Sequence, residues 1–133
     1  MNKLEHIGIA VKNLDESNVL FARLLGKPHY KVEEVATEGV RTSFFEVGGI
    51  KIELLEATRP DSPIARFIEK RGEGIHHLAF DADPLEDKMN ELKENGFVLL
   101  ADAPRAGADH KEVVFVHPKS TQGVLIELCQ EKK

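Results

Sequence analysis

The chain has 133 residues, of which 41% are hydrophobic and 31% are charged, and its formal net charge is −5 at pH 7. This length and composition fit a soluble globular protein with one domain, and they exclude a disordered chain. Because Lys and Arg are scattered and no apolar run approaches the roughly 20 residues that span a bilayer, neither nucleic acid nor a membrane is expected as a partner.

The first predicted elements are a strand over residues 5–11, where apolar and polar residues alternate, and a helix over residues 15–26. Asp15 is the expected N-cap of this helix, and Gly26 fits the left-handed position that follows a helix C-terminus. The helix is indicated by apolar residues at helical spacing, which are Val19, Leu20 and Leu24.

Three strands should follow, near residues 30–35, 40–47 and 50–56. Gly48-Gly49 predicts a tight hairpin turn between the last two. Residues 58–73 are a linker that begins with turn-rich sequence. The linker should carry a short helix over residues 64–70, with Pro63 in its first turn.

The second half repeats this order of elements. A strand over residues 76–82 should precede a helix over 84–96, in which Leu85, Met89 and Leu92 have helical spacing and Gly96 follows the last turn. Further strands are predicted near residues 97–100, 112–117 and 123–129, with a longer turn over 118–123.

Aligned segments indicate that the chain is an internal duplication. Residues 5–11 match 76–82, the two helix ends match, and residues 49–55 match 123–129, at offsets of 71, 70 and 74 residues. Half a chain of this size buries too little surface to be stable alone, so the halves should share a core. We therefore predict an α+β fold in which two tandem βαβββ modules, residues 1–57 and 74–133 of a single domain, form a cup-shaped, partly open eight-stranded β-barrel with helices outside.

The duplication superposes His6 on His77 and Glu53 on Glu127. If the first and last strands of each half are central neighbours, these side chains meet. Two imidazoles and two carboxylates suit one divalent ion of Co, Mn, Ni, Fe or Zn and leave positions open for a substrate. Alone, a strand histidine or glutamate is more often solvent-facing or packed, but the repeated position of all four favours a metal site. His76 should point to the opposite face of its strand.

Four stretches of the sequence resemble the vicinal oxygen chelate superfamily, and most closely its methylmalonyl-CoA epimerases. These stretches are residues 6–11, 61–65, 74–79, and 117–119 with 123–128. The resemblance implies that His6, His77 and Glu127 hold the metal together with Glu53, where some epimerases have glutamine. It also implies an acyl-CoA substrate and a homodimer.

The activity that this resemblance implies is epimerisation of (2R)- and (2S)-methylmalonyl-CoA by 1,1-proton transfer through a metal-stabilised enediolate. Glu53 and Glu127 are the hypothesised bases, because the repeat places them on either side of the substrate. A glutamate proposed as a base in some epimerases is replaced here by Thr42. Further candidates are Glu46, His110 and Glu112 as bases, and Lys119 and His110 as substrate-binding residues.

Two other functions are compatible with the same pattern. A glyoxalase I-type lactoylglutathione lyase would use the same metal, and a non-catalytic small-molecule binding or resistance protein would generally lack the full ligand set. A cytoplasmic location is expected, because the N-terminus lacks the features of a signal peptide and the single Cys129 cannot form an internal disulfide.

Overall fold

The computed structural model describes all 133 residues, which form two compact units. The N-terminal unit consists of His6–His76, and the C-terminal unit consists of His77–Lys133 together with Met1–Glu5. No helix of the protein combines the length and the apolar character that a membrane crossing requires.

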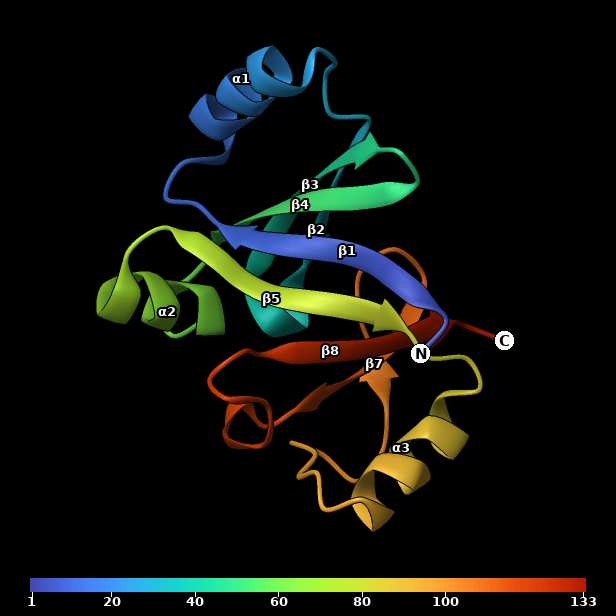
Figure 1. Ribbon diagram of the computed structural model, residues 1–133. Helices are drawn as coiled ribbons and strands as arrows, with labels where there is room; N and C mark the ends of the chain where they lie inside the picture. Colours follow the sequence, from blue (N-terminus) through green and yellow to red (C-terminus); the bar gives the residue numbers. More distant parts are fainter. The chain divides into compact units, whose positions relative to one another are not determined.

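The N-terminal unit is built from one sheet and two α-helices. Its elements are β1 (Lys3–Ala10), α1 (Leu14–Leu25), β2 (Lys31–Val35), the short 3-10 helix η1 (Ala36–Glu38), β3 (Val40–Val47), β4 (Ile50–Ala57) and α2 (Pro63–Arg71). The strand order is β2-β3-β4-β1 (Figure 1). β2, β3 and β4 are antiparallel neighbours, whereas β4 and β1 run parallel.

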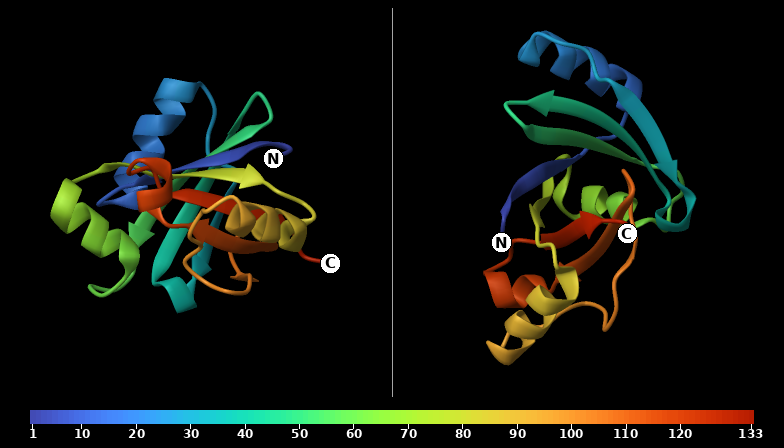
Figure 2. Two further views of the ribbon diagram at one scale, coloured as in Figure 1. Left: turned by 60° about the horizontal axis from the view of Figure 1, so that its bottom comes forward. Right: turned by 90° about the vertical axis from the view of Figure 1, so that its right-hand side faces the viewer.

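The two helices of this unit cover opposite faces of its sheet. Leu14 at the start of α1 is buried in a cluster with Phe45 and Leu54, whereas Ile64 of α2 is buried in a second cluster with Leu55. Leu54 and Leu55 are consecutive residues of β4, so their side chains point to opposite faces. The right-hand view of Figure 2 shows α1 lying along the strands β2, β3 and β4.

The helix expected near residues 15–26 is present as α1, but its N-cap differs from the prediction. Asn13 is the N-cap, and its side chain accepts a hydrogen bond from the Glu16 backbone N–H at 2.9 Å. Asp15 lies in the first turn of the helix, where its charge interacts favourably with the helix dipole. Gly26 follows the helix with φ 76°, as predicted.

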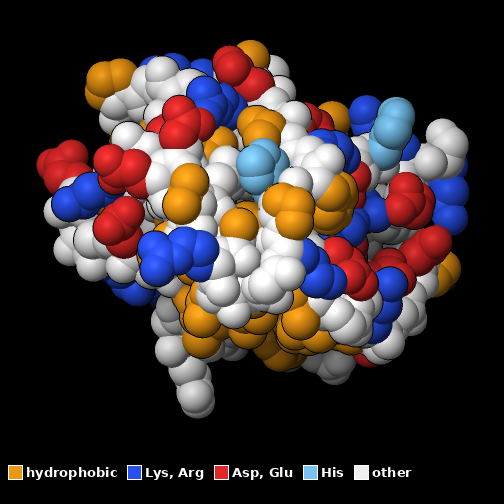
Figure 3. All heavy atoms as spheres, turned by 90° about the horizontal axis from the view of Figure 1, so that it is seen from above, with side chains coloured by type: hydrophobic (Ala, Val, Ile, Leu, Met, Phe, Trp, Pro, Cys, Tyr) orange, Lys and Arg blue, Asp and Glu red, His pale blue; other side chains and the backbone are white.

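The apolar stripe that indicated α1 is not the stripe that packs. Val19, Leu20 and Leu24 are 61%, 60% and 71% exposed. A second stripe, which includes Leu14 and Phe21, faces the sheet instead. Figure 3 views the protein from the side of α1 and shows hydrophobic side chains among interspersed acidic and basic ones.

The C-terminal unit repeats the arrangement of the first. Its elements are β5 (Gly74–Asp81, of which the first residues belong to the other unit), α3 (Leu85–Glu94), β6 (Arg105–Ala106), β7 (Lys111–Val116), the 3-10 helix η2 (Pro118–Thr121) and β8 (Ile126–Glu131). The order is β5-β8-β7-β6, and β5 and β8 run parallel. α3 covers one face by packing Leu85 and Met89 against Val114, Val116 and Leu128.

Two strand predictions in this half are wrong in their bounds. Residues 97–100 form only an isolated bridge between Leu99 and Val116, although Phe97 and Leu99 pack against the core of this unit. The two-residue strand β6 forms the edge in its place. β8 begins at Ile126 rather than at Gly123, because Gly123 has φ 91° and still belongs to the turn.

The α+β class, the eight strands and the twice-repeated β-α-β-β-β order are confirmed. The Gly48-Gly49 turn is also confirmed, since both residues have the positive φ that a two-residue hairpin requires, 60° and 85°. In the linker, α2 starts at Pro63, and the buried Ser62 caps it by accepting a hydrogen bond from the Ala65 N–H.

Candidate metal centre

The first histidine–glutamate pair lies in the N-terminal unit. Glu53 of β4 is opposite Gly8 of β1, and His6 is two residues before Gly8, on the same face of the strand. The His6 Nδ1 and Glu53 Oε2 atoms are 3.1 Å apart. Both residues are buried, with 5% and 4% of their surface exposed.

The second pair has the same construction in the C-terminal unit. Glu127 of β8 is opposite Ala79 of β5, and His77 is two residues before Ala79. The His77 Nε2 and Glu127 Oε1 atoms are 3.4 Å apart, and both residues are buried. The parallel pairing of the first and last strand of each half therefore brings one imidazole and one carboxylate together twice.

The charge of the buried side chains fits a divalent cation. The buried carboxylates of Glu53 and Glu127 each lie beside a buried imidazole. A bound divalent ion would offset their negative charge, which is otherwise costly to bury. His6, Glu53, His77 and Glu127 all belong to groups of buried side chains that could hold a metal ion. The donor set thus fits the metals named from the sequence.

His76 has a different environment from its neighbour His77. Its ring meets Phe67 of α2 edge-on, with the ring centroids 5.0 Å apart. Burial lowers the pKa of His76 to about 4, because the charged imidazolium is poorly solvated there. His76 is therefore a neutral, packed histidine near neutral pH.

Two phenylalanines beside the pairs were not singled out in the sequence. Phe44 of β3 lies opposite Glu53, and Phe115 of β7 lies opposite Glu127. The Phe115 ring also meets the His77 ring nearly perpendicularly, at 5.8 Å between centroids. A phenylalanine at this place in both halves could have drawn attention to them. However, the phenylalanine and the glutamate are 9 residues apart in one half and 12 in the other, because the second turn is longer.

The other predicted site residues lie in several places. Lys119 is exposed in η2, where its backbone N–H donates to His117 Nδ1, and His110 is exposed in the turn before β7 with φ 58°. Glu46 accepts a hydrogen bond from the Gly49 N–H and so belongs to the hairpin turn. Thr42 is 1% exposed and lies opposite Leu55 on the face of Glu53.

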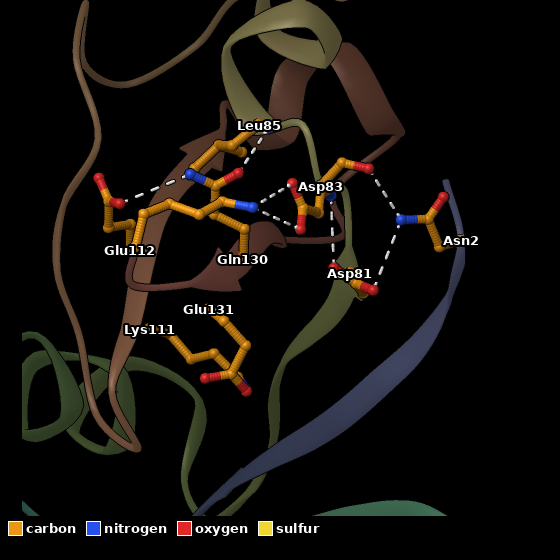
Figure 4. Close-up of polar contacts among 9 residues, drawn as sticks. Asn2, Asp81, Asp83, Leu85, Lys111, Glu112, Gln130 and Glu131 are labelled. Atoms are coloured by element: carbon orange, nitrogen blue, oxygen red, sulfur yellow. Dashed lines mark hydrogen bonds and ion pairs between the residues drawn. The ribbon is translucent and has the colours of Figure 1, made fainter.

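Figure 4 shows side chains on both faces of β7 and β8 in the C-terminal unit. Glu112 lies near Gln130, whose side-chain oxygen accepts from the Leu85 N–H of α3 at 2.8 Å. Lys111 contacts Glu131 on the opposite face, the one that carries Glu127. Because successive residues alternate, Glu112 points away from Glu127 and is not placed to act with it.

Cys129 is not a candidate nucleophile. Burial raises the pKa of its thiol, and the negative charges of Glu127 and Glu5 raise it further. The thiol is fully buried and stays protonated, so it lacks the thiolate that nucleophilic chemistry needs.

Comparison with known proteins identifies a family over most of the chain. A family model described as the Glyoxalase/Bleomycin resistance protein/Dioxygenase superfamily matches residues 5–115. The matched region includes His6, Glu53 and His77. The predicted resemblance to the vicinal oxygen chelate superfamily is thereby confirmed.

The chain is similar to characterised and uncharacterised relatives over nearly its whole length. The uncharacterized protein YqjC of Bacillus subtilis is 39% identical over 99% of this chain and 94% of its own. The mitochondrial methylmalonyl-CoA epimerase of Mus musculus is 34% identical over 98% of this chain and 74% of its own. A variant of Streptomyces coelicolor methylmalonyl-CoA epimerase, solved in complex with 2-nitronate-propionyl-CoA, is 31% identical, covers 100% of this chain and 99% of its own, and superposes with a TM-score of 0.94.

Proposed function

The chain belongs to the glyoxalase/bleomycin resistance protein/dioxygenase superfamily, and on this premise we propose that it is a metal-dependent epimerase of methylmalonyl-CoA. The observation that carries the proposal is the buried histidine–glutamate pair that recurs at the same strand register in both units. Full-length similarity to proteins named methylmalonyl-CoA epimerase supports the choice of substrate.

His6, Glu53, His77 and Glu127 are the side chains that would together hold one divalent ion of Co, Mn, Ni, Fe or Zn. When bound, such an ion supplies a Lewis acid to the thioester and carboxylate oxygens of the substrate. The residues themselves contribute two neutral imidazole donors and two carboxylates whose charges offset the ion. A homodimer and a cytoplasmic location remain predictions from the sequence.

The proton transfer is assigned to the two glutamates. One carboxylate removes the proton from C2, and the electron pair of the broken C–H bond is delocalised into the thioester. The other glutamate, which enters this step as a protonated carboxylic acid, then donates its proton to the opposite face of C2, which inverts the centre and leaves the abstracted proton on the first glutamate. A carboxylate that holds a metal is a weak base, so at least one of Glu53 and Glu127 must loosen its hold during turnover. A positioned base typically contributes on the order of 10²–10⁴ in rate.

The test uses metal-stripped protein with and without added Co²⁺, and follows exchange of the C2 proton of methylmalonyl-CoA by NMR in deuterated buffer. Exchange is expected only with metal. Glu53→Gln and Glu127→Gln, each loaded with metal, should lose at least about 10²-fold in rate. Full activity of either metal-loaded variant would exclude that glutamate as an essential base.

A glyoxalase I-type lyase would use the same four ligands, and a binding protein would show no turnover. Methylglyoxal with a thiol cofactor is therefore assayed beside methylmalonyl-CoA. Turnover of methylglyoxal alone would replace the epimerase proposal with the lyase. Tight binding of acyl-CoA without proton exchange would replace it with a binding function.

A further inference from the structure

The outer face of α1 carries apolar side chains that are largely exposed. Val19, Leu20 and Leu24 are 61%, 60% and 71% exposed. The opposite side of the helix packs Leu14 and Phe21 against the sheet. Single exposed apolar residues are common on protein surfaces, but three neighbours on one face of a 12-residue helix form a continuous patch. Such a patch is typical of a contact with another molecule.

Two charged side chains complete this face of the helix. An α-helix turns by about 100° per residue, so Glu16 and Arg23, which are seven residues apart, point in directions that differ by only about 20°. By the same geometry Val19 and Leu20 lie about 50° to either side of the line between them. Glu16 and Arg23 are both exposed. The face therefore has an acidic residue near its N-terminal end, a basic residue near its C-terminal end and apolar residues between them.

This pattern is complementary to a second copy of itself. If a two-fold axis passes between Val19 and Leu20 at right angles to α1, the helices of the two copies run antiparallel. Glu16 of each copy then faces Arg23 of the other, and Val19 faces Leu20. Two attractive charge contacts would flank an apolar centre. A parallel pairing would instead bring each charged residue against its own equivalent, so charge favours the antiparallel arrangement.

We propose that the outer face of α1 is an interface between two copies of this chain, packed antiparallel about a two-fold axis. A homodimer was expected from the sequence without any surface for it, and this inference names the surface and the orientation. A helix of 12 residues is about 18 Å long and offers less than the roughly 800 Å² per partner of a standard interface. The dimer should therefore be weak, with a dissociation constant in the micromolar range. The inference does not depend on the proposed metal site.

The first test is sedimentation equilibrium of the wild-type protein from low micromolar to submillimolar concentration, which should show a reversible monomer–dimer equilibrium. Glu16→Arg and Arg23→Glu each turn both attractive contacts into repulsive ones, because the two-fold axis doubles every change. Each variant should dimerise at least about tenfold more weakly than the wild type. The matched control is Glu86→Arg, which makes the same charge change on an exposed residue in the first turn of α3. It should leave the dissociation constant unchanged, because it lies outside the proposed interface.

The sharper test mixes the two single variants. In a heterodimer of Glu16→Arg with Arg23→Glu both contacts are attractive again, so the mixture should dimerise about as well as the wild type although neither variant does so alone. The double variant Glu16→Arg/Arg23→Glu should likewise recover the homodimer. Leu20→Ser should weaken the dimer by removing apolar area from its centre. All of these positions are exposed, so thermal unfolding midpoints close to that of the wild type are expected and verify that each variant is folded.

Three results would overturn the inference. A wild-type protein that stays monomeric over the whole concentration range would leave this face open to a different partner. A dimer whose dissociation constant is the same in both charge variants as in the wild type would have its interface elsewhere. A mixture of the single variants that stays monomeric would show that Glu16 and Arg23 do not face each other. These results are independent of metal binding and of proton exchange at C2, which test the proposed function.

Discussion

His76 and His77 are adjacent on β5, yet they lie on opposite faces and have different surroundings. His77 lies beside Glu127, whereas His76 packs against Phe67, where burial lowers its pKa from 6.5 to about 4. The unfolded chain therefore binds a proton at His76 between these pH values and the folded protein does not. His76 should contribute to stability fully above pH 6.5, and this contribution should fall as the pH drops toward about 4.

The measurement is urea unfolding of the metal-free wild type and of His76→Phe at several pH values across this window. The wild type should lose stability relative to the variant as the pH falls, by at most about 1.4 kcal/mol per pH unit. The comparison cancels the pH dependence of all the other groups, which both proteins share. Parallel pH dependence of the two proteins would show that His76 titrates normally in the folded state.

At the scale of elements, the start of α1 gives a test of its cap. Asn13 accepts the Glu16 N–H, while Asp15 in the first turn is an exposed side chain that lies 3.3 Å from Arg41. Asn13→Ala should reduce the free energy of unfolding by about 1 kcal/mol, the usual cost of removing an N-cap side chain. Asp15→Ala is the matched control and should cost less, because exposed ion pairs contribute little. A larger loss in Asp15→Ala would mean that the helix is capped as the sequence first indicated.

Helix α1 also shows what could not be predicted from the sequence alone. The helix could be predicted because apolar residues recur at its period, but the sequence of α1 carries two apolar stripes, and only the packing against Phe45 and Leu54 selects the one with Leu14. Residues 97–100 were predicted as a strand because they follow the second helix at the place where the first half has its second strand. Whether such a run forms a strand depends on a partner, and here β7 offers a single bridge at Leu99.

For the candidate site, the equivalence of the two halves was enough to relate His6 with Glu53 and His77 with Glu127, because equal positions in a duplicated fold have equal neighbours. Phe44 and Phe115 are 71 residues apart, the same offset that relates the first strands of the two halves, whereas Glu53 and Glu127 are 74 residues apart because the second turn is longer. The repeat therefore relates the two rings to each other, but strand register was needed to place each ring opposite its glutamate.

At the scale of the whole molecule, metal should control stability as well as turnover. The proposed site contains two buried carboxylates, Glu53 and Glu127, whose charge a bound divalent ion would offset. Adding Co²⁺ at about 100 times its dissociation constant should raise the free energy of unfolding by about 2.7 kcal/mol, if the unfolded chain does not bind it. Thermal unfolding of stripped and reloaded protein measures the effect, with Mg²⁺, which prefers oxygen ligands, as the control. Equal thermal unfolding midpoints with and without Co²⁺ would contradict a metal site built from buried ligands.

The division of the chain between the units also determines which fragments of the protein could contain a whole unit. Met1–Glu5 belongs to the same compact unit as His77–Lys133, and Asn2 is hydrogen-bonded to Asp81 and Asp83 there. A single nick in the linker consequently produces no fragment that contains the whole C-terminal unit. Fragment complementation would require the N-terminal piece to donate its first residues to the other piece. A C-terminal half expressed by itself would need that segment restored, either as an added peptide or by fusion to its own N-terminus.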